Sequence, residues 1–140
     1  MRTALWIVTG LVVLPVLSAC RGREASARVA AGETAAIAQL RSLFAAEAAF
    51  NASNNHYACT IAELALSPGL IDREMSTGQK NGYAFDVHCA AQIDLPAYQI
   101  WASPLVAGES GVNLYCTDQT GVVRRTRRLL DACSKARPVE

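Results

Sequence analysis

The chain has almost no excess charge of either sign and few aromatic side chains. Thirteen lysines and arginines oppose twelve acidic residues, and aromatic residues make up 6% of the 140 positions. Proteins dedicated to nucleic acid usually carry a marked positive excess, so we do not expect nucleic acid as a partner. The sequence also has no internal repeat and no low-complexity tract, and its length suits a single domain.

Motifs for metal, cofactor and phosphate chemistry are missing as well. The cysteines form no CxxC pair, which leaves zinc binding and thioredoxin-like redox chemistry without support. The glycines occur singly and not in a phosphate-binding loop. His56 and His88 lie far apart, have no metal-ligand spacing around them, and are expected at the surface. We therefore expect no metal, no cofactor and no enzymatic activity.

What the chain does have is an export segment. Arg2 supplies a positive start, and the apolar stretch after it is about fourteen residues long, too short for a membrane-spanning helix of about twenty. Leu17-Ser18-Ala19-Cys20 resembles the lipobox of bacterial lipoproteins at all four positions. The resemblance implies a lipoprotein signal peptide over residues 1–19 and lipid, such as palmitate, on the thiol of Cys20. The alternative is an ordinary signal peptide cleaved after Ala19.

A lipid on Cys20 would hold the protein to a membrane. Two or three acyl chains anchor a protein stably, whereas one binds a bilayer only marginally. Residues 20–33 show no apolar period, so we expect the lipidated Cys20 to be followed by a short tether. In bacteria with two membranes, an Asp after the lipidated cysteine often means retention in the inner membrane. Arg21 therefore favours the outer membrane, at its periplasmic face or at the cell surface.

The rest of the chain changes from helical to strand periodicity. Apolar residues recur at three- and four-residue steps from Ala35 to about Phe50, which predicts one amphipathic helix capped by Thr34. Thr60-Ile61-Ala62-Glu63 has the form of a capping box and predicts a short helix through Leu66. Alternation then predicts four short strands, over 83–89, 98–103, 112–117 and 122–126. The expected fold is α+β, with one N-terminal helix packed on a four-stranded antiparallel sheet.

One carboxylate falls inside the apolar arc of the long helix. Glu47 lies on the same face as Leu40, Leu43 and Phe44, and a carboxylate there costs free energy unless it is hydrogen-bonded. We expect Glu47 to accept bonds from backbone amides of the segment that crosses the helix. The alternative is a catalytic acid or metal ligand, in an envelope enzyme with a site near Glu47, His56 and Asp72.

Two features of the predicted sheet are open to a functional interpretation. The sharpest charge cluster consists of Arg124, Arg125, Arg127 and Arg128. The simplest interpretation is a solvated edge strand that charge protects from further pairing. The alternative is an anion- or DNA-binding surface. Similarly, Trp101 and Tyr115 could form a cross-strand aromatic pair or a stacking platform on the outer face of the sheet.

Four cysteines follow Cys20, an even number that suits disulfides in an oxidising compartment. Of the three possible pairings we expect Cys59–Cys89 and Cys116–Cys133. The first would fasten the crossing segment to the end of the first strand. The second would fold the end of the chain back beside the third strand. The alternative pairings would join the C-terminal tail to the crossing segment or to the first strand, which requires the chain to run further back.

Several motifs of the folded part occur in a familiar order. A long Ala-rich helix is followed by Tyr57-Ala58-Cys59-Thr60, then by Gly82-Tyr83-Ala84-Phe85 at the start of the sheet and by the run 115–124 at its end. Together they resemble the globular head of type IV pilin-like and pseudopilin-like proteins. A lipobox and a tether stand where prepilins have a processing site and a long apolar helix. The resemblance implies a pilin-head-like domain over residues 34–137, in a non-enzymatic lipoprotein that binds another envelope protein or acts as an accessory factor.

Overall fold

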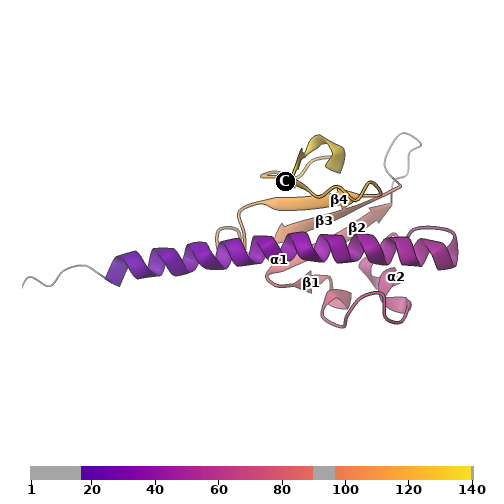
Figure 1. Ribbon diagram of the computed structural model, residues 1–140, viewed down its shortest axis with the longest axis horizontal. Helices are drawn as coiled ribbons and strands as arrows, with labels where there is room; N and C mark the ends of the chain where they lie inside the picture. The colour runs from indigo at the N-terminus through magenta and orange to yellow at the C-terminus, as the bar shows by residue number, and fades with distance from the viewer. Residues whose placement is uncertain (1–16, 90–96, 140) are drawn as a thin grey trace, which may run out of the picture.

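The computed structural model describes residues 17–89 and 97–139, and it shows one long helix lying against an antiparallel sheet (Figure 1). The α+β class expected from the sequence is therefore confirmed. The apolar region of the predicted signal peptide lies outside the described residues. The same holds for the side chains of residues 17–21, with Cys20 among them.

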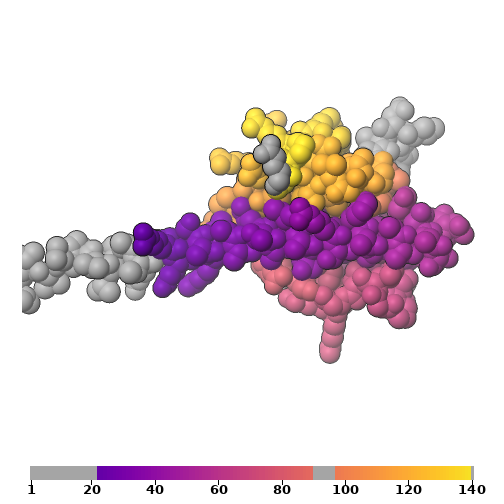
Figure 2. All heavy atoms as spheres, in the orientation of Figure 1, coloured from indigo at the N-terminus to yellow at the C-terminus, as the bar shows by residue number. Residues whose placement is uncertain are grey.

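The long helix extends much further towards the N-terminus than its periodicity predicts. Helix α1 spans Leu17–Asn54, 38 residues without a break, so residues 20–33 are helical and the prediction that Thr34 caps the helix is wrong: Thr34 Oγ1 donates to the carbonyl of Ala30 at 2.9 Å, inside the helix. That stretch contains no proline and is rich in alanine and arginine, which favour helix even where no apolar face is needed. Continuing a helix that is already packed also avoids the cost of nucleation. Residues 22–28 are all exposed, and we call them the stalk (Figures 1 and 2).

Beyond the stalk, a narrow stripe of buried side chains holds α1 against the sheet. The stripe repeats in steps of four and three residues, which keeps its members on one face of a helix: Ala36, Leu40, Leu43, Glu47 and Phe50. It packs on inward-facing residues of the sheet, including Tyr83, Phe85, Val87 and Ile100. These two sets form the main core.

The segment that leaves α1 crosses to the sheet through one short helix. Helix α2, Ile61–Leu66, begins where the capping box was predicted: the Glu63 amide donates to Thr60 Oγ1 at 3.1 Å. Glu63 Oε2 in turn accepts from the amide of Cys59, at 2.8 Å. A single 3₁₀ turn, η1 (Met75–Thr77), then leads into the first strand.

The sheet has six strands in sequential antiparallel order and not the four that were predicted. The strands are β1 (Gln79–Lys80), β2 (Tyr83–Cys89), β3 (Tyr98–Pro104), β4 (Leu114–Asp118), β5 (Arg124–Thr126) and β6 (Arg137–Pro138). The two additional strands, β1 and β6, are only two residues long, too short for alternation to show. Gly121 in the β4–β5 turn has φ of 73°, as expected for that hairpin position.

The end of the chain forms a third layer that covers the outer face of β3 and β4. Trp101 and Cys116 are register partners, and they cluster with Cys133 and Ala136 from the C-terminal segment. The Cys133 amide also donates to Gln99 Oε1, at 2.6 Å. Strand β3 is consequently buried on both faces.

Trp101 and Tyr115 form neither of the two predicted arrangements. Trp101 pairs in register with Cys116, whereas Tyr115 pairs with Ala102. Neighbouring residues of a strand point to opposite faces, so Trp101 lies on the outer face. Tyr115 belongs to the main core.

Gly32 lets α1 approach the β3–β4 connection closely. A Cβ atom on Gly32 would lie 2.1 Å from the carbonyl oxygen of Ser110, whereas one on Gly22 would meet nothing within 4 Å. Ala for Gly inside a helix normally stabilises by up to about 1 kcal/mol. We expect Gly22→Ala to follow that rule and Gly32→Ala to destabilise by about 2 kcal/mol through overpacking. Urea unfolding of both variants checks this, and equal stabilisation by both would contradict the contact with Ser110.

Candidate functional site

Two disulfides fix the segments that flank the sheet, and they join the cysteines that the sequence predicted. Cys59 is bonded to Cys89 at the end of β2, with Cα atoms 4.9 Å apart. Cys116 in β4 is bonded to Cys133, with Cα atoms 5.8 Å apart. The first bond ties the segment after α1 to the sheet, and the second holds the C-terminal layer in place.

Glu47 has the structural role expected of it. Its side chain is 0% exposed, and Oε2 accepts a hydrogen bond from the amide of Ala58 at 3.0 Å. Oε1 has no hydrogen-bond partner among the described residues. Burial therefore raises the pKa of Glu47 to about 7, although the Ala58 bond opposes the shift and the charge of Glu63 adds to it.

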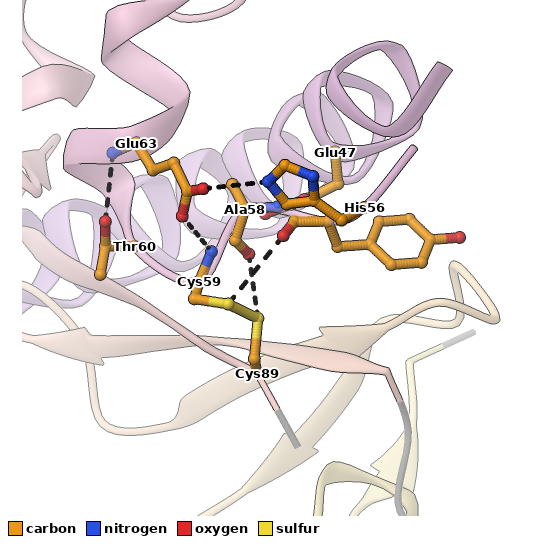
Figure 3. Close-up of a disulfide and its surroundings, with 8 residues drawn as sticks. Glu47, His56, Ala58, Cys59, Thr60, Glu63 and Cys89 are labelled. Carbon is orange, nitrogen blue, oxygen red and sulfur yellow. Dashed lines mark hydrogen bonds and ion pairs between the residues drawn. A yellow bond between two sulfur atoms is a disulfide. The ribbon is translucent and has the colours of Figure 1, made fainter. Parts of the chain in front are cut away.

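His56 follows Glu47 by nine residues in the sequence, but its ring pairs with the carboxylate of Glu63 and not with that of Glu47 (Figure 3). Its Nε2 is 3.4 Å from Glu63 Oε1, and the His56 side chain is 59% exposed. The ring also packs edge-on against Phe50, with centroids 5.4 Å apart. His56 is thus a surface residue, as the sequence suggested, and it contacts Phe50 of α1 and Glu63 of α2.

The candidate enzyme site at Glu47, His56 and Asp72 is not assembled as one open pocket. Asp72 lines a hollow of about 280 Å³ with Ser42 and Lys80, and neither Glu47 nor His56 lines it. Asp72 forms an ion pair with Lys80 and accepts from the amide of Met75 at 2.8 Å. Each of the three candidate residues is therefore engaged locally, and Glu47 is out of reach of solvent.

A second glutamate of α1, which sequence reasoning placed in the tether, holds the helix to the sheet. Glu33 Oε1 accepts from the amides of Val112 and Asn113 at 2.9 and 3.0 Å and from Asn113 Nδ2 at 2.9 Å. Glu33 Oε2 accepts from the Tyr115 hydroxyl at 3.0 Å. Burial alone would raise the pKa of Glu33, but the four bonds outweigh it and the pKa is lowered. We call this arrangement the Glu33 clamp.

The signal that could have revealed the Glu33 clamp is the spacing of the buried stripe. Continued towards the N-terminus from Leu40 in steps of four and three, the stripe reaches Ala36 and then Glu33. The half-buried Glu33 and the fully buried Glu47 thus both lie on the sheet-facing side of α1. Each accepts hydrogen bonds from backbone amides of a crossing segment.

Beside the Glu33 clamp lies a basic groove of about 650 Å³ at the β5–β6 end of the sheet. Its charged lining consists of Arg125, Arg127, Arg128, Lys135 and Arg137, all of them exposed. Three of these were candidates from the sequence, whereas Lys135 and Arg137 were missed. The fourth candidate, Arg124, is half-buried and does not line the groove. The predicted edge strand is also wrong, because β6 pairs with β5.

The described residues contain few other features of a reactive site. His88 is exposed, and its Nε2 lies 3.0 Å from Asp86 Oδ2. Across residues 17–89 and 97–139, no three His, Cys, Asp or Glu side chains gather closely enough to hold a metal ion. No helix in the described part of the chain combines the length and the apolar character needed to cross a bilayer.

Comparison of the chain with protein-family models, characterised proteins and solved structures finds no match.

Proposed function

We propose that this protein is a lipoprotein of the bacterial cell envelope, anchored through lipid on Cys20, whose pilin-head-like domain binds another envelope protein without catalysis. The observation that carries the proposal is the continuity of α1 from Cys20 into the core. About 20 Å of helix separates Cys20 from Glu33, at about 1.5 Å per residue. A lipid on Cys20 would therefore be joined to the head by a rigid spacer.

The likeness to a pilin head has support in the arrangement of the layers. A long helix lies across an antiparallel meander, and a disulfide closes the C-terminal segment onto that sheet. Where a pilin would continue into an apolar helix, this chain has the exposed stalk. The stalk suits a monomeric head on a lipid anchor better than a subunit of a filament core.

Binding to a protein is favoured by apolar side chains on the β3–β4 connection. Leu105, Val106 and Val112 are 46%, 49% and 49% exposed. The connection is held in shape, because Ser110 Oγ bonds the backbone of Val106 and the Glu33 clamp fixes Val112. A rigid loop with exposed apolar side chains is a typical protein-binding feature. The connection therefore gives an envelope partner a preformed surface.

The disulfides and Arg21 support the proposed location in the cell envelope. Two disulfides suit an oxidising compartment such as the periplasm. Arg21 after the lipidated cysteine favours the outer membrane, at its periplasmic face or the cell surface, over retention in the inner membrane. A spacer of about 20 Å would let the head reach partners in the envelope space.

The anchor is tested with Cys20→Ser. The thiol is the acyl acceptor, so we expect the variant to remain as an unprocessed precursor without lipid. The native protein should partition into detergent and carry the added mass of diacylglycerol on Cys20. Mass spectrometry and detergent partitioning of protein purified from membranes measure both. An unchanged mass and unchanged partitioning in Cys20→Ser would rule out the lipoprotein assignment.

The partner is sought in the same membranes with a photo-crosslinking residue at Val106. The matched control carries the same residue at Arg41, an exposed position of α1. A discrete adduct with one envelope protein from position 106, and none from position 41, supports the proposed binding. The same adducts from both positions would show contact without a specific surface.

A further inference from the structure

The basic groove combines a concave shape with an unusual concentration of one charge. The chain as a whole has a formal net charge of only +1, yet five cationic side chains line one hollow, and none of the described residues that line it is a carboxylate. The concentration is therefore a local feature of the fold and not a result of a generally basic sequence.

The arrangement of the arginines works against the stability of the sheet. Arg125 of β5 and Arg137 of β6 are direct register partners. Like charges that face each other across two strands destabilise a sheet. Among the described residues, only Lys135 of the groove has a carboxylate within ion-pair distance, Asp131 at 2.5 Å. The four arginines of the groove thus form no ion pair among the described residues.

Guanidinium groups gathered in this way fit phosphate. An arginine side chain presents a planar fork of donors that can hold two oxygens of one phosphate group. Asn113 adds a polar residue to the lining of the groove. A phosphate bound between Arg125 and Arg137 would neutralise the repulsion between the two strands.

The position of the groove selects the source of the phosphate. Asn113, which lines the groove, is also held by the Glu33 clamp, where the stalk meets the head. Thr126, another lining residue, is the register partner of Leu114 in β4. The groove therefore lies near the end of the head from which the stalk leaves. The stalk adds Arg23 and Arg28, both exposed, on the way to Cys20.

We infer that the basic groove binds the phosphate headgroups of an anionic bilayer, the one to which the chain is anchored. Tilting of α1 about Cys20 lowers the stalk-side end of the head onto the membrane surface, while the end near Asn54 stays away from it. The lipid anchor supplies a high local concentration of headgroups, so that each contact can be individually weak. The head would then have a preferred orientation on the membrane.

The choice of a bilayer rests on the proposed anchor at Cys20, so the test uses a mature chain with Cys20→Ser. This chain reports on the groove whether or not the native cysteine is acylated. Its binding is measured by co-sedimentation with vesicles of phosphatidylglycerol and phosphatidylcholine in a one-to-three ratio, and with vesicles of phosphatidylcholine alone. We expect binding to the mixed vesicles only, weakening as salt is raised.

Two double variants in the Cys20→Ser chain separate the groove from overall charge. Arg125→Gln with Arg127→Gln removes two groove cations, whereas Arg41→Gln with Arg73→Gln removes two exposed arginines elsewhere. We expect the groove variant to bind mixed vesicles roughly tenfold more weakly, and the control to change by less than about twofold. The groove variant should also have a thermal midpoint at least as high as its parent, since it relieves the repulsion between Arg125 and Arg137.

Three results would overturn the inference. An equal loss in both double variants would show that only overall charge matters. Tighter binding to a duplex DNA fragment than to mixed vesicles would assign the groove to nucleic acid. Displacement from vesicles by low concentrations of inorganic phosphate, at constant ionic strength, would assign it to a free anion. Acylation of the native Cys20 is read separately by mass, so a failed anchor and a failed groove give different results.

Discussion

Removing either disulfide by double alanine substitution is expected to lower the free energy of unfolding by about 3–4 kcal/mol. The Cys59–Cys89 bond spans 30 residues and the Cys116–Cys133 bond spans 17, and each restricts the unfolded chain by closing a loop of that size. A loss of this size is a large share of the stability of a small domain, about 5–15 kcal/mol. Chemical unfolding of the two double variants measures it.

The two disulfide variants should differ in what else they change. Trp101 is the only tryptophan after Cys20, and it is covered by the C-terminal segment that Cys116–Cys133 holds. The Cys116→Ala, Cys133→Ala variant should therefore shift the Trp101 emission to the red under native conditions. The Cys59→Ala, Cys89→Ala variant serves as its control and should leave the emission unchanged. Identical native emission in the two disulfide variants would contradict the packing of the C-terminal segment over Trp101.

Glu47→Gln is expected to remove most of the pH dependence of stability between about pH 4.5 and 7. The pKa of Glu47 is raised from 4.5 to about 7 in the folded protein. The stability that this group contributes is fully present below pH 4.5 and is lost as the pH rises through about 7. The loss amounts to at most about 3 kcal/mol, because a tenfold change in a proton-binding constant corresponds to about 1.4 kcal/mol. Above that range, Glu47→Gln should be the more stable protein.

The choice of glutamine matters because the amide oxygen can still accept the bond from Ala58. Glu47→Ala would leave that amide without a partner and should destabilise at every pH. Glu109→Gln, at an exposed position, is the matched control and should leave the pH profile as it is. Urea unfolding from pH 4 to 8 gives the profiles, and parallel profiles for the native chain and Glu47→Gln would refute the assignment.

Local patterns were sufficient to predict much of the head. Alternation located β2 and β3 because their inward residues, such as Tyr83, Val87 and Ile100, face a single apolar layer. Glu47 was predicted correctly because a carboxylate within an apolar stripe has few alternatives to a backbone amide. The cysteine pairing followed from the order of the strands, since a meander brings sequence neighbours side by side.

The features that were missed depend on contacts between distant parts of the chain. Periodicity could not mark the stalk, because a helix that packs against nothing needs no apolar face. Lys135 and Arg137 join the basic groove only because the chain folds back after Cys133. The burial of Trp101 on the outer face of the sheet depends on the same return of the chain. No pattern within a short stretch of sequence predicts that the chain folds back over the sheet after Cys133.

Because α1 is continuous from Cys20 into the head, the number of residues in the stalk determines the direction in which the head faces. Each residue of an α-helix turns the chain by about 100° and advances it by only about 1.5 Å. Deleting one residue of the stalk would therefore swing the basic groove through more than a quarter turn about the helix axis while hardly changing its height. Deleting seven would bring it back to nearly its original bearing, about 10 Å closer to Cys20. The stalk thus sets the azimuth of the head as strictly as its distance from the anchor.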